Sequence, residues 1–384
     1  MSTQTVNSGD VVLRGYCTPK YEHLRETFLG NFREYGEIGG SYTVMVGGEV
    51  VADLWGGWKD KAATVAWERE SIACVWSVSK AIAGVCFAML VDRGIISYED
   101  KVSKYWPEFA AQGKGDVTIG MLLSHQAGIT GFDTPATQED LFAGEAAAQR
   151  LAAQAPLWPM GTAAGYSNAV GILATALFKR IEGRSIKRFV AEELRDSSLG
   201  LDISVGVEQQ DRPRVAPMLN EDKLESVNTV PMGNPAQRAM NNPPVTSDVS
   251  GEPGFQDADF LAMNVFSNAN ALAAMYDLLL RPGKDGRRLA SAATLADATK
   301  IRYDGVDMVR GIRRLWAAGF MRNDDAKCWG PNPEAFGHGG WGGSFAFADP
   351  AADVTVAYVM NLMSDQMDNN PRRRRLTEAV YAAI

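Results

Sequence analysis

The sequence predicts an α/β protein with an added α-helical part: one antiparallel β-sheet, flanked by N- and C-terminal helices, with an inserted, mainly helical domain. Two observations predict this class. Apolar and polar residues alternate in strand pairs near both ends of the chain, and helical periodicity replaces them in the middle. Neither end has enough strands for a sheet of its own, so both ends are expected to share one. This assigns residues 1–100 and 262–384 to an α/β sandwich domain and residues 101–261 to a helical domain.

The N-terminal elements are expected to be a helix and a β-hairpin. Apolar residues recur at three- and four-residue steps through residues 18–35, which predicts a helix with one apolar face. Residues 41–46 and 49–54 alternate around Gly47 and Gly48, a two-residue turn suited to a hairpin.

The C-terminal elements repeat this combination. Residues 344–348 and 354–360 predict a second hairpin, with a turn near residues 349–350. A helix is expected to follow over residues 372–383. Both ends of the chain therefore supply a hairpin and a flanking helix.

The middle of the chain is predicted to be mainly helical. Residues 77–93 are apolar nearly all round, which predicts a buried helix. Further helices are expected over residues 117–123, 170–181 and 271–280. Residues 217–253 are rich in Pro, Asn, Gly and Ser and show no period, so we expect an irregular segment that lines a pocket.

Charge and hydropathy exclude several functions. The 384 residues carry a formal net charge of −8, which favours neither nucleic acid nor an anionic membrane surface. We interpret the basic cluster from Arg372 to Arg375 as the solvated face of the last helix, with an anion or partner site as the alternative. No apolar run approaches the roughly 20 residues of a membrane helix, and residues 1–10 lack a signal-peptide pattern. We therefore expect a cytoplasmic protein, monomeric or homo-oligomeric.

Metal or cofactor chemistry is not expected. The chain has three histidines and no HExxH motif, which argues against a zinc hydrolase. Its four cysteines show no CxxC or other metal-like spacing, so we expect reduced, structural thiols. They are Cys17, Cys74, Cys86 and Cys328.

Ser77 and Lys80 form a Ser-x-x-Lys motif, which places a hydroxyl nucleophile and a possible base one helical turn apart. Ser77 stands where the strand-like residues 72–76 give way to the buried helix, so its amide is expected at the positive end of the helix dipole. Burial of a lysine lowers its pKa towards neutrality, which would let Lys80 accept the serine proton. The alternative is an N-cap serine followed by a surface lysine, with Ser79 as another possible cap.

Tyr166, Ser167 and Asn168 are expected to begin another helix. A tyrosine near a lysine can be stabilised as its phenolate, act as a general base for Ser77 and later protonate the leaving group. Asn168 offers an amide that can bind a substrate carbonyl or hold Lys80. The alternatives are a half-buried tyrosine with a satisfied hydroxyl and a helix-capping asparagine.

A glycine-rich run that contains His338, Gly339 and Gly340 leads into a strand. Glycine lets a backbone approach a ligand closely. Free amides at a strand edge can complete an oxyanion hole whose other donor is the amide of Ser77. His338 can bind a carboxylate or a leaving group. A tight strand entry without catalytic meaning is the alternative.

A hydrolase with a Ser-His-Asp triad is disfavoured. The chain has no G-x-S-x-G nucleophile elbow, and His125 has no obvious serine partner. We interpret residues 124–128 as a structural helix end.

Taken in order, these segments resemble the serine β-lactamase-like superfamily, which includes class C β-lactamases, DD-peptidases and family VIII carboxylesterases. The resemblance covers nearly the whole chain and implies the β-lactamase/transpeptidase-like fold, with the site between the α/β sandwich and the helical domain. Beyond the three motifs it includes residues 122–128, 166–171, 199–202, 268–271 and 337–350.

The resemblance also implies roles for the first two motifs. Ser77 would be the acylated nucleophile, and Lys80 and Tyr166 would share the general base and acid work. Asn168 matches the asparagine of the family's Tyr-x-Asn box and would bind substrate.

The third motif departs from the family pattern. The residues His338, Gly339 and Gly340 stand in the place of the Lys-Thr-Gly box, as a substrate-binding segment, which puts the second oxyanion amide on Trp341. That box helps bind the carboxylate of β-lactam antibiotics, so efficient β-lactam hydrolysis is not expected from a chain without its lysine and threonine.

Residues 199–202 and 268–271 are most similar to the family VIII esterases. We therefore expect a serine hydrolase that cleaves small-molecule, short-acyl carboxylic esters through an acyl-enzyme on Ser77, without a metal or cofactor. The alternatives are amidase or DD-peptidase-like activity, weak β-lactam hydrolysis or acyl transfer at the same site, and a non-catalytic scaffold on this fold.

Overall fold

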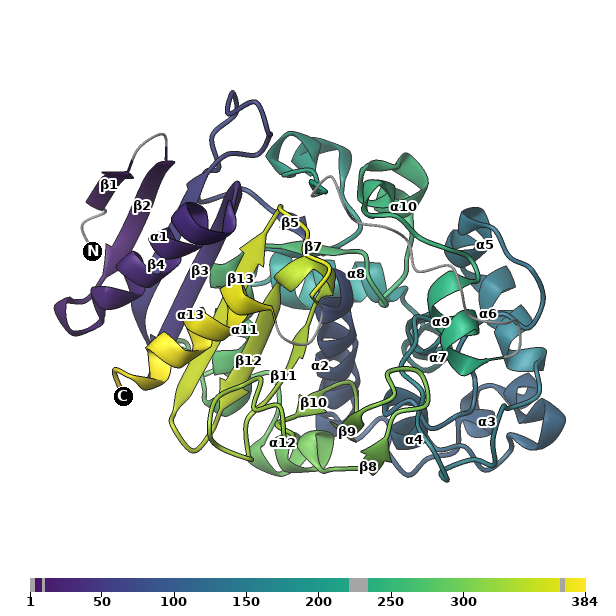
Figure 1. Ribbon diagram of the computed structural model, residues 1–384. Helices are drawn as coiled ribbons and strands as arrows, with labels where there is room; N and C mark the ends of the chain where they lie inside the picture. Colours follow the sequence, from purple (N-terminus) through teal and green to yellow (C-terminus); the bar gives the residue numbers. More distant parts are fainter. Residues whose placement is uncertain (1–3, 9–10, 221–233, 367–369) are drawn as a thin grey trace.

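The computed structural model describes residues 4–8, 11–220, 234–366 and 370–384. Its centre is a ten-stranded antiparallel sheet to which both ends of the chain contribute, as the sequence predicted (Figure 1). The strand order is β1-β2-β4-β3-β13-β12-β11-β10-β9-β8. The strands are β1 (Gln4–Ser8), β2 (Val11–Cys17), β3 (Gly39–Val46), β4 (Glu49–Gly57), β8 (Tyr303–Val306), β9 (Arg313–Trp316), β10 (Met321–Arg322), β11 (Phe336–Gly339), β12 (Phe345–Asp349) and β13 (Val354–Met360).

The two predicted hairpins form the middle of this sheet. Gly47 and Gly48 join β3 to β4 with φ angles of +60° and +82°, the signs that a type I′ hairpin turn requires at both positions. Strand β13 pairs with β3, with Tyr358 opposite Tyr42, and this pairing joins the two ends of the chain. The strands outside these hairpins, β1, β2 and β8–β11, were not predicted. The glycine-rich run was expected to lead into a strand, but His338 and Gly339 themselves belong to β11. Strand β10, with two residues, is too short to show a period.

Helices cover both faces of the sheet (Figure 1). Tyr42 points to one face, where its hydroxyl donates to the carbonyl of Leu376 in α13, and α13 packs against α1. The neighbouring Ser41 points to the other face, where its Oγ accepts a hydrogen bond from Ala269 N at the start of α11. Alternate side chains of β3 thus anchor two helical layers.

The rest of the chain is mainly helical and includes a three-stranded sheet of order β5-β7-β6. None of the helices in the described ranges is long and apolar enough to cross a membrane. The small strands are β5 (Ala73–Cys74), β6 (Ile203–Val205) and β7 (Val265–Ser267). The α-helices are α1 (His23–Tyr35), α2 (Ser79–Asp92), α3 (Val102–Tyr105), α4 (Ile119–Leu123), α5 (Gln138–Phe142), α6 (Glu145–Ala153), α7 (Ala169–Glu182), α8 (Ile186–Val190), α9 (Pro235–Asn241), α10 (Pro253–Asp257), α11 (Ala269–Leu280), α12 (Ala292–Thr299) and α13 (Pro371–Tyr381). Short 3-10 or π turns are η1 (Pro19–Tyr21), η2 (Trp76–Val78), η3 (Pro107–Gly113), η4 (Ala191–Arg195), η5 (Gln209–Arg214), η6 (Ser247–Gly251) and η7 (Trp341–Gly343).

Several predicted elements differ from the structure. The helix expected over residues 18–35 is divided into the turn η1 and the helix α1, which begins at His23. The buried helix α2 begins at Ser79, and Ser77 lies in the turn η2 before it. The helix α4 begins two residues later than expected, because Thr118 caps it by accepting a hydrogen bond from Met121 N. The irregular segment 217–253 contains α9 and η6 in its described part, so that prediction is wrong there, and residues 221–233 lie outside the described residues.

The interpretation of the arginine cluster as a solvated face is wrong for its first two members. Arg372 and Arg373 are buried, whereas Arg374 is exposed. Arg372 pairs with buried Glu37 at 3.0 Å and donates to the carbonyl oxygens of Gly342 and Leu362. These partners supply the opposite charge and the hydrogen bonds that a buried guanidinium requires, and the charged one, Glu37, comes from a distant part of the sequence.

Candidate active site

Ser77 lies on a strained turn between β5 and α2. The preceding residue, Trp76, has φ of +50° and is fully buried. This left-handed conformation costs an L-residue about 1–2 kcal/mol, so surrounding contacts must hold it. The ring of Trp76 packs edge-on against that of Trp341, with centroids 5.0 Å apart. The turn before the hydroxyl nucleophile is therefore fixed by packing.

Lys80 is buried among acceptors. Its Nζ donates to the Ala262 carbonyl at 2.9 Å and to Asn168 Oδ1 at 3.0 Å, and lies 3.2 Å from Ser77 Oγ. Burial lowers the pKa of Lys80 from 10.5 to about 7. When the amine is neutral, its two N–H groups suffice for Ala262 and Asn168, and its lone pair is left for the hydroxyl of Ser77.

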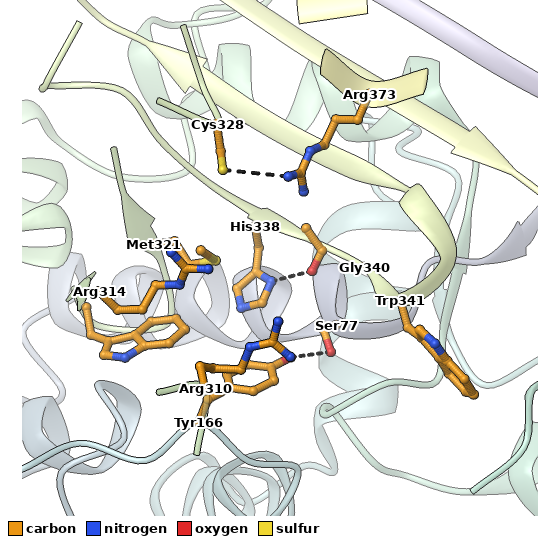
Figure 2. Close-up of a pocket in the computed structure, with 12 residues that line it drawn as sticks. Ser77, Tyr166, Arg310, Arg314, Met321, Cys328, His338, Gly340, Trp341 and Arg373 are labelled. Carbon is orange, nitrogen blue, oxygen red and sulfur yellow. Dashed lines mark hydrogen bonds between the residues drawn. The ribbon is translucent and has the colours of Figure 1, made fainter. Parts of the chain in front are cut away.

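Tyr166 completes a cluster with Ser77 and Lys80. Its Oη donates a hydrogen bond of 2.5 Å to Ser77 Oγ, and the two residues face each other in Figure 2. Lys80 Nζ lies 4.8 Å from the centre of the phenol ring. The structure thus brings together the three residues that the sequence predicted as catalytic.

Asn168 does not act as the helix cap that was its alternative interpretation. It precedes α7, but its side chain makes no capping hydrogen bond. Its amide oxygen instead accepts a hydrogen bond from Lys80. Of the two functional interpretations, the described contacts fit the one in which Asn168 holds Lys80.

The glycine-rich run is clamped onto the turn that carries Ser77. A Cβ at Gly340 would lie 2.2 Å from Ser344 Oγ and 2.3 Å from the Val75 carbonyl oxygen, so only glycine fits there. Ser344 Oγ donates to the same Val75 carbonyl at 3.1 Å. Ser77 follows Val75 by two residues, and Trp341 directly follows Gly340. The contact between Gly340 and Val75 therefore sets the position of Trp341 relative to Ser77.

His338 is neutral in its buried position. Burial and the nearby charge of Lys80 lower its pKa from 6.5 to about 3. Its Nδ1 lies 2.7 Å from the Gly339 carbonyl oxygen, which can only accept, so Nδ1 carries the proton. A neutral ring offers no charge to a substrate carboxylate, which narrows the predicted role of His338 to hydrogen bonding.

Two cavities meet at Ser77. The smaller has a volume of about 50 Å³, and the larger, predominantly apolar one about 620 Å³. Both are lined by Ser77, Tyr166, Arg310 and Trp341. The small cavity is also lined by Arg314, Trp316, Met321, Cys328, His338, Gly339, Gly340 and Arg373 (Figure 2).

The larger cavity supports the expectation that segment 217–253 lines a pocket. Asn220, Ala236 and residues 238–248, from the described part of segment 217–253, contribute to the lining of the larger cavity. Within the described part of the chain, none of the four cysteines forms a disulfide. Cys328 lines the smaller cavity and is partly exposed, whereas the other three cysteines are buried. No group of metal-binding side chains occurs among the residues that the structure describes.

Sequence reasoning missed the residues that support Tyr166. Trp316 stacks on the phenol, with ring centroids 5.6 Å apart and planes 6° apart. His125, interpreted as part of a structural helix end, packs against both rings, at 5.2 Å from Tyr166 and 4.7 Å from Trp316. Burial lowers the pKa of His125 well below 6.5, so it also packs as a neutral ring. No sequence motif marks Trp316.

Comparisons with known proteins show the family and the fold of the chain. A model of the beta-lactamase family matches residues 24–381. Esterase/beta-lactamase LipL of Mycobacterium tuberculosis (strain ATCC 25618 / H37Rv) is 31% identical over 359 residues, which cover 90% of this chain and 82% of LipL. The crystal structure of a family VIII carboxylesterase superposes with a TM-score of 0.90 at 35% identity, covering 97% of this chain and 100% of that one. A penicillin-binding protein homologue from Caulobacter crescentus also superposes with a TM-score of 0.90, at 36% identity and the same coverage.

Proposed function

The chain belongs to the beta-lactamase family, and on that premise we propose that it is a serine hydrolase that cleaves short-acyl carboxylic esters through an acyl-enzyme on Ser77. One observation carries the proposal. Ser77 Oγ lies within hydrogen-bond distance of both Lys80 Nζ, at 3.2 Å, and Tyr166 Oη, at 2.5 Å, where two cavities meet. A hydroxyl beside a desolvated amine and a phenol is the arrangement expected of an activated nucleophile.

In the acylation step, Ser77 Oγ attacks the ester carbonyl while its proton passes to the basic pair Lys80 and Tyr166. The carbonyl oxygen becomes an oxyanion, which the backbone amides of Ser77 and Trp341 stabilise. Removal of one such donor typically costs about 3–4 kcal/mol of transition-state stabilisation. The intermediate collapses when Tyr166 protonates the departing alcohol oxygen and the C–O bond breaks.

In the deacylation step, water attacks the acyl group on Ser77, and the same basic pair takes its proton. The second tetrahedral intermediate releases the carboxylic acid, and Ser77 Oγ regains a proton. Lys80 and Tyr166 both lie around one serine oxygen, so their protonation is coupled and the pair acts as a unit. Asn168 keeps Lys80 in place through both steps.

The two cavities support an ester with one short and one bulky side. About 50 Å³ admits only a small group, whereas about 620 Å³ lies within the usual range for small-molecule pockets. The name of the family VIII carboxylesterase favours ester chemistry, and the name of LipL gives both esterase and beta-lactamase. The name of the penicillin-binding protein homologue supports, as the second candidate, reaction with the β-lactam amide of a penicillin at the same site. The cytoplasmic location and the domain boundaries stay predictions.

A series of p-nitrophenyl esters from acetate to laurate tests the proposal. We expect kcat/KM to be highest for the short acyl chains and to fall towards laurate, and we expect Ser77→Ala to remove turnover of every ester. Turnover by Ser77→Ala within about tenfold of the unsubstituted protein would contradict the mechanism, because loss of a serine nucleophile ordinarily costs far more.

A further inference from the structure

We propose that Asp307 is the positioning residue for Tyr166. It holds the phenol against Ser77 through the backbone N–H of Tyr166 and through the indole of Trp316. The inference rests on the proposed function, in which Tyr166 exchanges a proton with Ser77. Asp307 itself does not line either cavity and acts only through the residues that it holds.

The carboxylate of Asp307 is fully buried and accepts hydrogen bonds from four N–H groups. Asp307 has no exposed surface and directly follows β8, the last strand of the large sheet. Its Oδ2 accepts hydrogen bonds from Tyr166 N and from Trp316 Nε1, both at 2.9 Å. Its Oδ1 accepts hydrogen bonds from Val309 N and Arg310 N, also at 2.9 Å. A buried carboxylate is tolerated only with such partners, so these contacts define its place closely.

These bonds restrain Tyr166 in two independent ways. The hydrogen bond from Tyr166 N to Asp307 fixes the backbone position of Tyr166. A nearby hydrogen bond from Met308 N to the Ala164 carbonyl, at 2.8 Å, reinforces this position. The bond to Nε1 fixes the indole of Trp316, whose plane lies within 6° of the phenol plane. Asp307 therefore determines both where the tyrosine backbone lies and which way its ring faces.

This restraint matters because Tyr166 works through one short-range contact. Its Oη lies 2.5 Å from Ser77 Oγ, and hydrogen bonds weaken steeply with distance and angle. A misplacement of about 1 Å at a catalytic group can cost about a hundredfold in rate. The same carboxylate also holds the backbone of Arg310, which lines both cavities.

The test begins with Asp307→Asn. The amide has nearly the same shape, but it directs an NH₂ group at N–H donors that need an acceptor. We expect kcat for p-nitrophenyl acetate to fall roughly tenfold to a hundredfold with little change in KM. The matched control is Asp349→Asn, which alters an equally buried carboxylate that accepts hydrogen bonds from Ala351 N and Ala352 N in the β12–β13 turn and lines neither cavity. That control should keep kcat within about twofold, as expected for a site without contact to the reacting groups.

The decisive measurement repeats Asp307→Asn in a Tyr166→Phe background. If Asp307 acts by placing the phenol oxygen, its replacement should cause little further loss once that oxygen is gone. An equal loss in both backgrounds would overturn the proposal and leave Asp307 a merely structural role. Normal kcat in Asp307→Asn, beside a large loss in Tyr166→Phe, would overturn it as well and leave the proposed function intact. Near-normal activity of Tyr166→Phe alone would contradict the proposed mechanism and the positioning role together.

A second variant keeps the test decisive if Asp307→Asn does not fold. Trp316→Phe keeps an aromatic ring against Tyr166 but has no Nε1 donor for Asp307. It should lower kcat in the unsubstituted protein and have little effect in the Tyr166→Phe background. An equal loss in both backgrounds, or no loss in either, would overturn the proposal.

Discussion

Lys80 Nζ donates a hydrogen bond of 3.0 Å to Asn168 Oδ1, and this bond joins the first turn of α2 to the start of α7. The two residues are 88 positions apart in the sequence. With the Ala262 carbonyl as its other strong acceptor, the amine is held where its remaining hydrogen-bonding position faces Ser77. The catalytic cluster therefore depends on a lysine that is desolvated but well satisfied.

The burial of Lys80 predicts a specific pH dependence of stability. Its folded pKa of about 7 lies below the ordinary value of 10.5, so between these pH values the unfolded chain binds more protons than the folded one. The free energy of unfolding contributed by this group therefore rises with pH across that window. Below about pH 7 the full cost of burying the charge is present.

Lys80→Met tests this dependence. We expect the variant to lose ester hydrolysis, to be more stable than the unsubstituted protein at pH 7 by a few kcal/mol, and to lose that advantage as the pH approaches 10.5. Urea unfolding across this pH range measures the difference. A constant stability difference at every pH would show that Lys80 does not titrate with a lowered pKa.

The close approach at Gly340 predicts a sharp contrast between two adjacent glycines. A methyl group at Gly340 meets Ser344 Oγ and the Val75 carbonyl, and would push Trp341 away from Ser77. At Gly339 the nearest atom is Arg373 Nη1 at 3.0 Å, the end of a side chain that can move. We expect Gly340→Ala to lower kcat about a hundredfold, as for a lost oxyanion donor, and Gly339→Ala to change it by only a few fold. Equal effects would contradict the predicted role of the Trp341 amide.

The neutral state of His338 predicts a preference for esters over β-lactams. Burial lowers its pKa to about 3, so at neutral pH it supplies no positive charge to the carboxylate of a β-lactam. We expect kcat/KM for p-nitrophenyl acetate to exceed that for the chromogenic cephalosporin nitrocefin by at least about a hundredfold. Comparable values would favour a penicillin-recognising site.

Local patterns were enough to predict the two central hairpins of the sheet and the first half of the site. Gly47 and Gly48 supply the positive φ angles that a two-residue hairpin turn needs, and the sequence shows this directly. The apolar character of α2 predicted a buried helix, and helical spacing then placed Lys80 beside Ser77. These predictions succeeded because each depends on neighbours within one element.

Residues that act through tertiary contacts could not be predicted in this way. Asp307 lies 141 positions from Tyr166 and belongs to no motif, although its carboxylate accepts the Tyr166 N–H. Ser344 likewise reaches Val75 only in the folded chain. Arg372 looked solvent-exposed because arginine is rarely buried, and only the structure shows that Glu37 compensates its charge.

The covalent intermediate on Ser77 is the central claim, and intact-protein mass spectrometry tests it most directly. Wild type and Ser77→Ala would each be mixed briefly with p-nitrophenyl acetate and quenched in acid, while p-nitrophenol release is recorded. We expect wild type to release p-nitrophenol and to gain the mass of one acetyl group, and we expect Ser77→Ala to do neither. An acetyl adduct or steady release that persists in Ser77→Ala, or the absence of both from wild type, would contradict the account.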